Sequence, residues 1–366
     1  MTSRPVLMPC GHFSREANPD GTPKCAICAE RAEVEALRAI TQTQAARTAE
    51  ASRPDPTPAA VTPAAAAPAI GETEPTAGVY NLPDSIYYAD PLRAYGIESL
   101  SATSHRHLVA PSTPAHYRWT IDHPDDGRTD AMIRGKALHA VALETADLAV
   151  FYETRSWKSA AGQAFLDAHP DHGDKVPALA ADVPAIEAMA KALHEHPLAR
   201  LGLSGGMAEQ ALFGQHPDLG VWLRCKLDYL TDAAGGRLIL TDIKTTECAH
   251  PDKFARSAGD YAYDLQADNS AWLAQRLGLA KHVTMIFAAV ETKPPYLVAV
   301  HEIDSSDLRN ARSVNEAAER TFAHCLATGH WPGYPARINR ISLPPWTARA
   351  REEALYDADD EGDDAA

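Results

Sequence analysis

Residues 224–246 read RCKLDYLTDAAGGRLILTDIKTT, and the rest of the chain is organised around them. Two runs rich in β-branched, aromatic and aliphatic residues flank a short turn that ends in Gly235 and Gly236, which predicts a β-hairpin. One strand supplies Asp228, and the next supplies Asp242 and Lys244. Side chains at i and i+2 share a face of a strand, and adjacent strands lie about 4.8 Å apart, so Asp228 can meet that pair.

Two carboxylates beside a lysine are typical of a site that holds Mg²⁺ and steadies a nucleophilic water. The alternative is a solvated ion pair, which is the commoner meaning of Asp-x-Lys on an exposed strand. Apolar residues at 238–240 and at Ile243 predict that the second strand is buried, where charged side chains are rarely placed without a partner or a metal. The setting favours a metal site, although these residues alone leave both interpretations open.

Length and composition predict one large globular domain with appendages. The 366-residue chain is 45% hydrophobic, which is ordinary for a folded core. It has no run of 18 apolar residues and no apolar segment after Met1, so we expect neither a membrane span nor a secretory signal. Its six cysteines form no disulfide framework, which favours a reducing, intracellular compartment.

The chain is acidic, which is unfavourable for contact with nucleic acid over a broad surface. The formal net charge is −15; residues 351–366 hold eight acids and one arginine, a net of −7, and the remainder still carries −8. Any contact with DNA is therefore expected to be a local basic channel.

The N-terminal 30 residues carry the ligands of a small zinc site. Cys10-Gly-His12 is followed by Cys25-Ala-Ile-Cys28, and this Cys₃His set has the spacing of a structural site. Four protein ligands fill the tetrahedron, so we expect Zn²⁺ here to stabilise the fold and take no part in catalysis. The alternative is three free cysteines and a surface histidine.

Composition divides the rest of the chain. Residues 31–51 have helical spacing of Val34, Leu37 and Ile40, and 52–79 form a Pro/Ala-rich stretch that is expected to be a disordered linker. A globular domain is expected over 80–347, and an acidic tail over 348–366. Within the domain the pattern predicts helices near 114–119, 131–144, 181–200, 251–257, 261–277 and 305–327, strands at 207–213, 221–231, 237–246, 282–291 and 296–303, and a helix with loops over 150–180. This order predicts an α/β sandwich around a mixed sheet.

From about Ile86 to Trp346 the chain resembles the exonuclease VIII (RecE-type) nuclease domain. That domain is a member of the PD-(D/E)XK superfamily, close to the RecB-type and phage lambda-type exonucleases. The resemblance is carried by Ser112–Tyr117, Gly135-x-x-x-His139 with Leu143-Glu144, Glu209, Lys226-Leu-Asp228, Asp242-Ile-Lys244-Thr-Thr246, Tyr261 to Gln266, Trp331-Pro332 and Leu343-Pro-Pro-Trp346. One departure is Ser270, which stands where the family often has a tyrosine four residues after the glutamine.

The resemblance implies a restriction-endonuclease-like α/β core, with a central mixed sheet flanked by helices, and a set of site residues. On its helix, His139 alone is more often a core residue than a ligand, but its place in the family motif implies a metal ligand. Asp228 and Asp242 would hold one or two Mg²⁺ or Mn²⁺ ions together with the backbone carbonyl of Ile243. Lys244 would orient the attacking water, and Glu209 is a weaker candidate for an indirect ligand. Contacts to DNA are expected from Gln266, Tyr261 and Thr245.

The same resemblance implies 5′ to 3′ digestion of linear double-stranded DNA, which leaves 3′ single strands for recombination. It further implies a single-strand annealing partner, a possible homo-oligomer and a bacterial or phage-encoded, cytoplasmic protein. Two alternatives stay open: a structure-specific endonuclease of the same superfamily, and a catalytically inactive adaptor that binds DNA or protein.

Overall fold

The computed structural model describes residues 75–124, 128–153, 156–169 and 175–360, together with four two-residue strands near the N-terminus. The chain forms two compact units, Met1–Pro63 and Ala64–Ala366. In the first, β1 (Val6–Leu7) pairs with β2 (Phe13–Ser14) and β3 (Glu16–Ala17) with β4 (Pro23–Lys24), both antiparallel. The expected zinc ligands Cys10, His12, Cys25 and Cys28 lie outside the described residues, as do the expected helix 31–51 and the linker up to residue 74.

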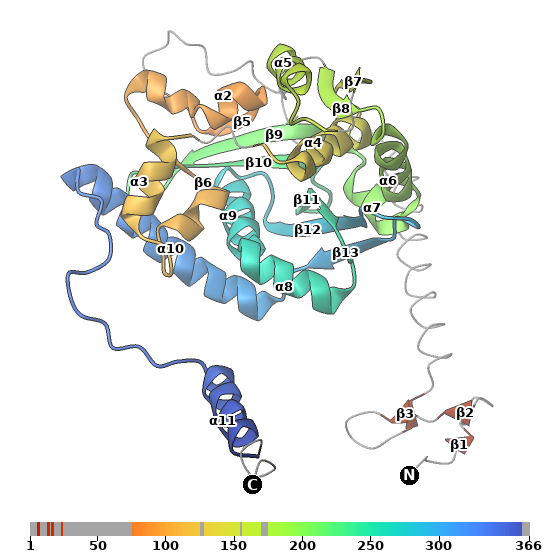
Figure 1. The fold of residues 1–366 in the computed structure, drawn as a ribbon. Coiled ribbons are helices and arrows are strands. Elements are labelled where there is room, and N and C mark those ends of the chain that lie inside the picture. Colours follow the sequence, from red (N-terminus) through yellow and green to blue (C-terminus); the bar gives the residue numbers. More distant parts are fainter. Residues whose placement is uncertain are drawn as a thin grey trace, which may run out of the picture. The chain divides into compact units, whose positions relative to one another are not determined.

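The second unit is built on a mixed seven-stranded sheet (Figure 1). Its main path runs β13-β12-β11-β10-β9-β5, and β6 pairs with β10 in parallel. The expected hairpin is present, since β10 and β11 are antiparallel, whereas β11 and β12 are parallel along their whole length. The strands are β5 (Gly78–Asn81), β6 (Ser99–Ser101), β9 (Gly206–Gln215), β10 (Trp222–Thr231), β11 (Arg237–Thr246), β12 (His282–Glu291) and β13 (Val298–Glu302).

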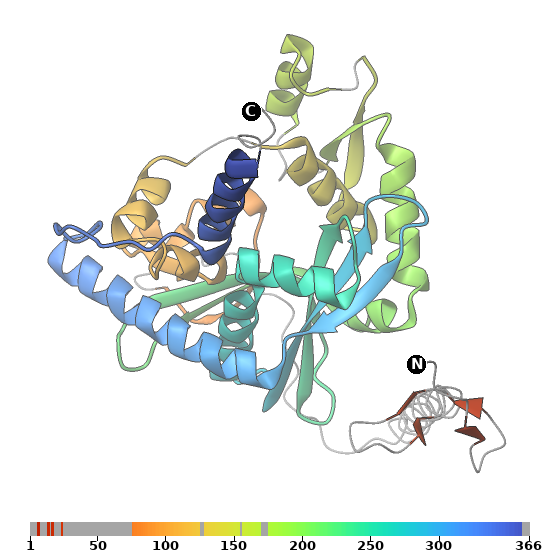
Figure 2. The ribbon, with the colours of Figure 1, turned by 60° about the horizontal axis from the view of Figure 1, so that its bottom comes forward.

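Helices cover both faces of this sheet (Figures 1 and 2). Successive residues of strand β12 show the two layers, because side chains alternate across a strand. Ala288 and Val290 pack in the cluster of α4 (Asp130–Ala142), α6 (Val183–Glu195) and α7 (Pro197–Gly202). Phe287 and Ala289 pack in the cluster of α8 (Pro251–Tyr261) and α9 (Tyr263–Arg276), and α10 (Ser305–Thr328) lies against α9.

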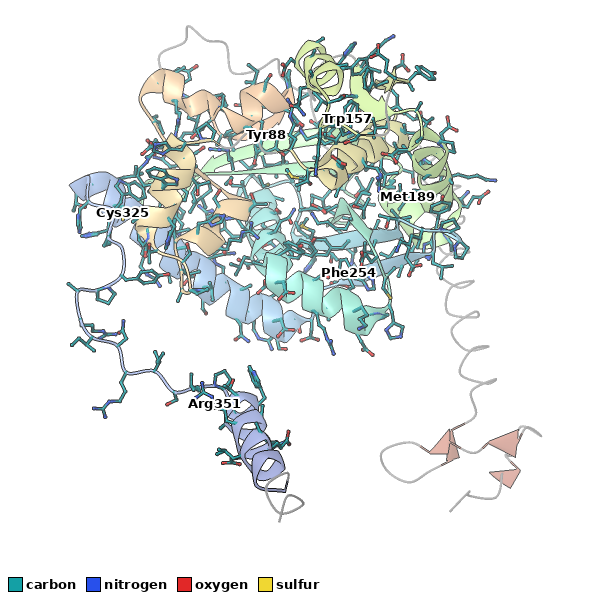
Figure 3. All side chains as sticks on the ribbon, in the orientation of Figure 1. Tyr88, Trp157, Met189, Phe254, Cys325 and Arg351 are labelled. Carbon is teal, nitrogen blue, oxygen red and sulfur yellow. The ribbon has the colours of Figure 1, made fainter. Side chains whose placement is uncertain are left out.

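Smaller elements complete the unit. They are α2 (Asp84–Tyr88), the 3₁₀ helices η1 (Pro91–Tyr95) and η2 (Ala102–His107), α3 (Pro114–Asp122), α5 (Ala160–Ala168) and α11 (Pro345–Asp360). In Figure 3, the labelled Met189, Phe254 and Trp157 mark three separate buried clusters. The third cluster lies under α5 and outside the main sheet. The α/β sandwich with a mixed sheet is therefore confirmed.

Three local expectations differ from the structure. Where a helix with loops was expected over 150–180, the chain forms a parallel pair, β7 (Asp147–Phe151) with β8 (Lys175–Leu179), around α5. The helix expected over 181–200 is two helices, α6 and α7, separated by the extended backbone of His196, because a residue before proline is disfavoured in a helix. Strand β5 begins at Gly78, so the last two residues of the expected linker belong to the sheet.

Two further features concern the helices and the cysteines of the described part. None of its helices combines the length and the apolar composition that crossing a membrane requires. Its three cysteines, Cys225, Cys248 and Cys325, are free thiols.

A paired substitution tests the close contact where β9 begins. A Cβ at Gly206 would lie 2.6 Å from the backbone Cα of Thr231 on β10, so the strands would have to separate. We expect Gly206→Ala to lower the free energy of unfolding by about 3 kcal/mol, as overpacking does. Gly259→Ala in α8 meets no atom within 4 Å and should raise it by about 0.5–1 kcal/mol through helix propensity. Urea denaturation of both variants checks this, and equal effects would contradict the packing of β9.

Candidate metal centre

The centre forms where the β10–β11 ladder opens. Backbone pairing of the hairpin extends only to Tyr229 opposite Thr241. Beyond that point Asp228 Oδ2 accepts the Ile243 N–H at 2.6 Å, so a side chain replaces a strand carbonyl. The two strands can diverge there without an unsatisfied amide, which leaves room for other side chains.

The neighbouring strand β9 is distorted at the same level. Its register with β10 runs from Gln210 opposite Leu227 to Ala208 opposite Tyr229, and Glu209 lies between with a left-handed φ of 56°. A bulky residue in this conformation costs on the order of 1–3 kcal/mol, and such strain gathers at functional sites. In this register Glu209 stands opposite Asp228, and the two carboxylates lie close together.

Three side chains converge in this opening. His139 from α4, Glu209 and Asp228 each offer one ligand atom, and these atoms lie within 4.8 Å of one another. His139 Nδ1 is 3.3 Å from Asp228 Oδ1, and its Nε2 is 3.1 Å from the Ile243 carbonyl oxygen. Octahedral Mg²⁺ has ligands at about 2.1 Å, so two opposite ligands are about 4.2 Å apart. The two carboxylates, with the nearby Ile243 carbonyl and one imidazole, therefore fit Mg²⁺ or Mn²⁺.

Asp242 and Lys244 form a second group beside these donors. Lys244 Nζ lies 2.6 Å from Asp242 Oδ2, and Gln266 Nε2 of α9 donates to Asp242 Oδ1 at 2.6 Å. The ammonium also lies 4.7 Å from the ring centroid of Tyr263. The two aspartates that were expected to act as one pair thus have different partners. Asp228 contacts His139 and the Ile243 amide. Asp242 contacts Lys244 and Gln266.

Burial and mutual repulsion shift the protonation of these groups. Burial favours neutral His139, but the Asp228 carboxylate outweighs it and raises the pKa of His139 to about 9. Burial together with the charge of Asp228 raises the pKa values of Asp242 and Glu209, whereas His139 and Lys244 lower the pKa of Asp228 despite its burial. The Lys244 pKa is raised by Asp242 and Asp228 although burial opposes this. A divalent cation would relieve the repulsion among these carboxylates.

Asp84 of α2 supports the centre in a way that sequence reasoning missed. Lys226 Nζ lies 2.6 Å from Glu209 Oε2 and is also ion-paired with Asp84, whose other oxygen lies 2.6 Å from Lys136 Nζ. The two lysines lower the Asp84 pKa although burial works against them. The partners of Asp84 are 52 and 142 residues away, so no local pattern could have marked it.

The residues expected to contact DNA are placed in three different settings. Gln266 is 8% exposed and its amide is used on Asp242, so it positions a carboxylate and does not present a surface to DNA. Tyr261 at the end of α8 is 59% exposed. Thr245 is half-buried on β11, beside Gly135 of α4.

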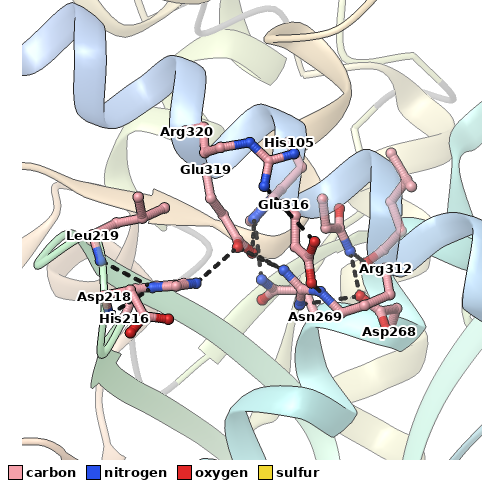
Figure 4. Close-up of polar contacts among 12 residues, drawn as sticks. His105, His216, Asp218, Leu219, Asp268, Asn269, Arg312, Glu316, Glu319 and Arg320 are labelled. Carbon is pink, nitrogen blue, oxygen red and sulfur yellow. Dashed lines mark hydrogen bonds and ion pairs between the residues drawn. The ribbon is translucent and has the colours of Figure 1, made fainter.

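Behind the centre, a buried polar network fixes α9 (Figure 4). Glu319 of α10 is fully buried, with Arg312 Nη2 at 2.6 Å from Oε2 and His105 Nε2 at 3.4 Å from Oε1. His105 in turn lies 3.1 Å from Asn269 Nδ2 of α9. Because α9 also carries Tyr263 and Gln266, this network holds the helix that positions Asp242.

Comparison with known families identifies the domain type. A family model described as a PDDEXK-like domain of unknown function (DUF3799) matches residues 113–344, more than half of the chain. No curated protein matches the sequence.

Two solved structures are similar in parts. A candidate exonuclease from Eubacterium rectale shares 13% identity over 72% of this chain and 95% of its own, with a TM-score of 0.49. A phage-related exonuclease from Haemophilus somnus 129PT shares 11% identity over 64% of this chain and 97% of its own, with a TM-score of 0.27. Neither likeness carries an argument about activity.

Divalent metal should stabilise the fold through the convergent donors. A ligand that binds only the folded state stabilises it by about 2.7 kcal/mol at 100 times its Kd. We therefore expect Mn²⁺ to raise the melting temperature of the wild type, and Asp228→Ala to abolish the shift. Asp232→Ala, which removes an exposed carboxylate on the hairpin turn, is the control and should keep it. An equal shift in all three proteins would exclude this metal centre.

Glu319 should make stability depend on pH in the acid range. Burial opposes its ionisation, but hydrogen bonds from His105 and Arg312 lower its pKa below the ordinary 4.5. A depressed pKa contributes stability that is fully present above the unfolded pKa and is lost as pH falls through the folded value. The free energy of unfolding should therefore fall less between pH 6 and pH 3 in Glu319→Gln than in wild type. Glu302→Gln, at an exposed position, should follow wild type, and identical slopes in all three would contradict the assignment.

Proposed function

Because the chain belongs to the DUF3799 family of PDDEXK-like domains, we propose that it is a divalent-metal-dependent deoxyribonuclease. The observation that carries the proposal is the convergence of His139, Glu209 and Asp228 within 4.8 Å, beside an ion-paired Asp242 and Lys244. The left-handed backbone of Glu209 and two carboxylates facing each other in a partly buried site further support a functional role.

Hydrolysis of a phosphodiester requires a positioned water and neutralisation of charge on the phosphate. Bound Mg²⁺ or Mn²⁺, held by His139, Asp228, Glu209 and the Ile243 carbonyl, would supply Lewis acidity toward the phosphate. Lys244 carries an ammonium beside this centre, and Asp242 restrains it at 2.6 Å. Its donors can orient the attacking water and stabilise the developing negative charge. Gln266 and Tyr263 hold this pair in place from α9.

The finer specificity that we propose is 5′ to 3′ digestion of linear double-stranded DNA, which leaves 3′ single strands for recombination. It is supported by the motif resemblance to RecE-type exonucleases. The corresponding partners would be DNA ends and a single-strand annealing protein, in a bacterial or phage-encoded cytoplasmic setting, with a homo-oligomer as the working form. Zn²⁺ at Cys10, His12, Cys25 and Cys28 remains a prediction of the sequence.

Digestion of matched DNA substrates tests this function. With Mg²⁺, the wild type should degrade 5′-end-labelled linear duplex from its ends and spare a closed circle of the same sequence. Lys244→Ala should lower the rate by about 10²–10³-fold, as loss of one transition-state donor does. Lys281→Ala, at an exposed position before β12, should keep wild-type activity.

The alternatives give different results in the same assay. Cutting of the closed circle would identify a structure-specific endonuclease with the same centre. Absence of cleavage in wild type and variant, with Mn²⁺ present, would reject enzymatic activity and favour a binding adaptor.

A further inference from the structure

The segment that follows α10 is the most basic stretch of an acidic chain. We define residues 333–351 as the C-terminal strap. It holds Arg337, Arg340, Arg349 and Arg351, and no Asp or Glu occurs between 320 and 351, although the chain has a net charge of −15. The strap runs without helix or strand until α11 begins at Pro345 (Figure 1).

The side chains of the strap are exposed. Its four arginines all lie at the surface, and none of them is ion-paired with any residue in the described part of the chain; Arg351 is labelled in Figure 3. Arg337 Nε donates only to the neighbouring Asn339 Oδ1, at 3.3 Å. Tyr334 and Trp346 are 71% and 73% exposed. Two accessible aromatic rings are thus each followed by two arginines that form no ion pair among the described residues, and the acidic run of the tail begins after them at Glu352.

Three lysines near the metal centre are each held by a carboxylate. Lys226 and Lys136 are both ion-paired with Asp84, and Lys244 with Asp242. Carboxylates therefore already neutralise the ammonium groups that could bind phosphates beyond the scissile one. The arginines of the strap are cations that a nucleic-acid backbone can bind without displacing a carboxylate.

The base of the strap is anchored on α3. The Pro332 carbonyl, at its base, accepts the Ala115 N–H of α3 at 3.1 Å, and Trp331 stacks on Tyr117 with ring centroids 5.4 Å apart. Tyr117 and Tyr88 line one cavity of about 300 Å³. Tyr88 belongs to α2, the helix whose Asp84 is joined through Lys226 to Glu209. The base of the strap and the helix that carries Asp84 thus border the same cavity.

We propose that the C-terminal strap binds a single strand of DNA, with its arginines on successive phosphates and with Tyr334 and Trp346 stacked on bases. Positive charge interleaved with accessible rings is the chemistry by which proteins hold unpaired strands without sequence preference. This inference extends the proposed nuclease function to the strand that remains after cleavage. Binding is measured in EDTA, where metal-dependent cleavage is absent, so the two proposals can fail separately.

Salt dependence of binding tests the arginines. The probe is a fluorescent (dT)₂₀ oligonucleotide, titrated with the full chain by anisotropy at several salt concentrations. Replacing Arg337, Arg340, Arg349 and Arg351 together by Gln should reduce the slope of log K against log salt by about 2.8, since each phosphate contact on a single strand contributes about 0.7. The control replaces four exposed cations elsewhere, Lys158, Lys191, Arg237 and Lys281, by Gln and should leave the slope within about 0.7 of wild type.

The rings are tested at constant charge. Tyr334→Ala and Trp346→Ala should each weaken (dT)₂₀ binding by about tenfold without changing the salt slope, as loss of one stacked base does. An unchanged slope in the four-arginine variant overturns the proposal. A second result also overturns it: the four-arginine variant sediments with a lower mass than wild type and still binds (dT)₂₀ equally well. The strap would then be an interface between copies of the chain. If the wild type binds blunt duplex more tightly than (dT)₂₀, and the four-arginine variant loses that preference, the strap binds duplex and the assignment to a single strand is overturned.

Discussion

The hydrogen bond from the Ile243 amide to Asp228 is the interaction on which the centre depends. It satisfies a buried donor that would otherwise require a strand carbonyl, so the ladder of β10 and β11 ends without an orphaned amide. At this level of the sheet His139 of α4 and Glu209 of β9 bring their ligand atoms close to Asp228. If a carbonyl of β10 accepted the Ile243 N–H instead, the β10–β11 ladder would continue past this point, and no carboxylate would be held beside that amide.

Buried charge is the constraint that follows, and the domain meets it with partners supplied from distant parts of the chain. Asp242 is 4% exposed and is held by Lys244 and Gln266, while Glu209 is held by Lys226. An unpaired buried charge is costly, so each carboxylate of the centre requires a fixed cation or donor. The buried contacts among His105, Asn269 and Glu319 fix the position of α9 in the same way, by giving each buried polar group a partner. The centre is therefore as rigid as the helices that surround it.

The sequence predicted those parts of this arrangement that depend on local pattern. Alternation and the Gly235-Gly236 turn marked the hairpin, and the motif that contains His139 indicated a helix facing Asp228. The opening between the strands could not be predicted, because it depends on which group accepts the Ile243 amide. For this reason the sequence predicted neither the close approach of Glu209 to Asp228 nor the contacts of Asp242 with Lys244 and Gln266. Asp84 and the β7–β8 pair were missed because their partners are far away in the sequence or their apolar runs are short.

The charge of the chain limits how such a domain can hold DNA. With a net charge of −15, long-range attraction toward a polyanion is absent, and the ammonium groups beside the centre are already paired. Favourable contact with phosphate must then come from a divalent cation among His139, Glu209 and Asp228, or from cations without a carboxylate partner. In the described part of the chain, the strap arginines are a group of that second kind.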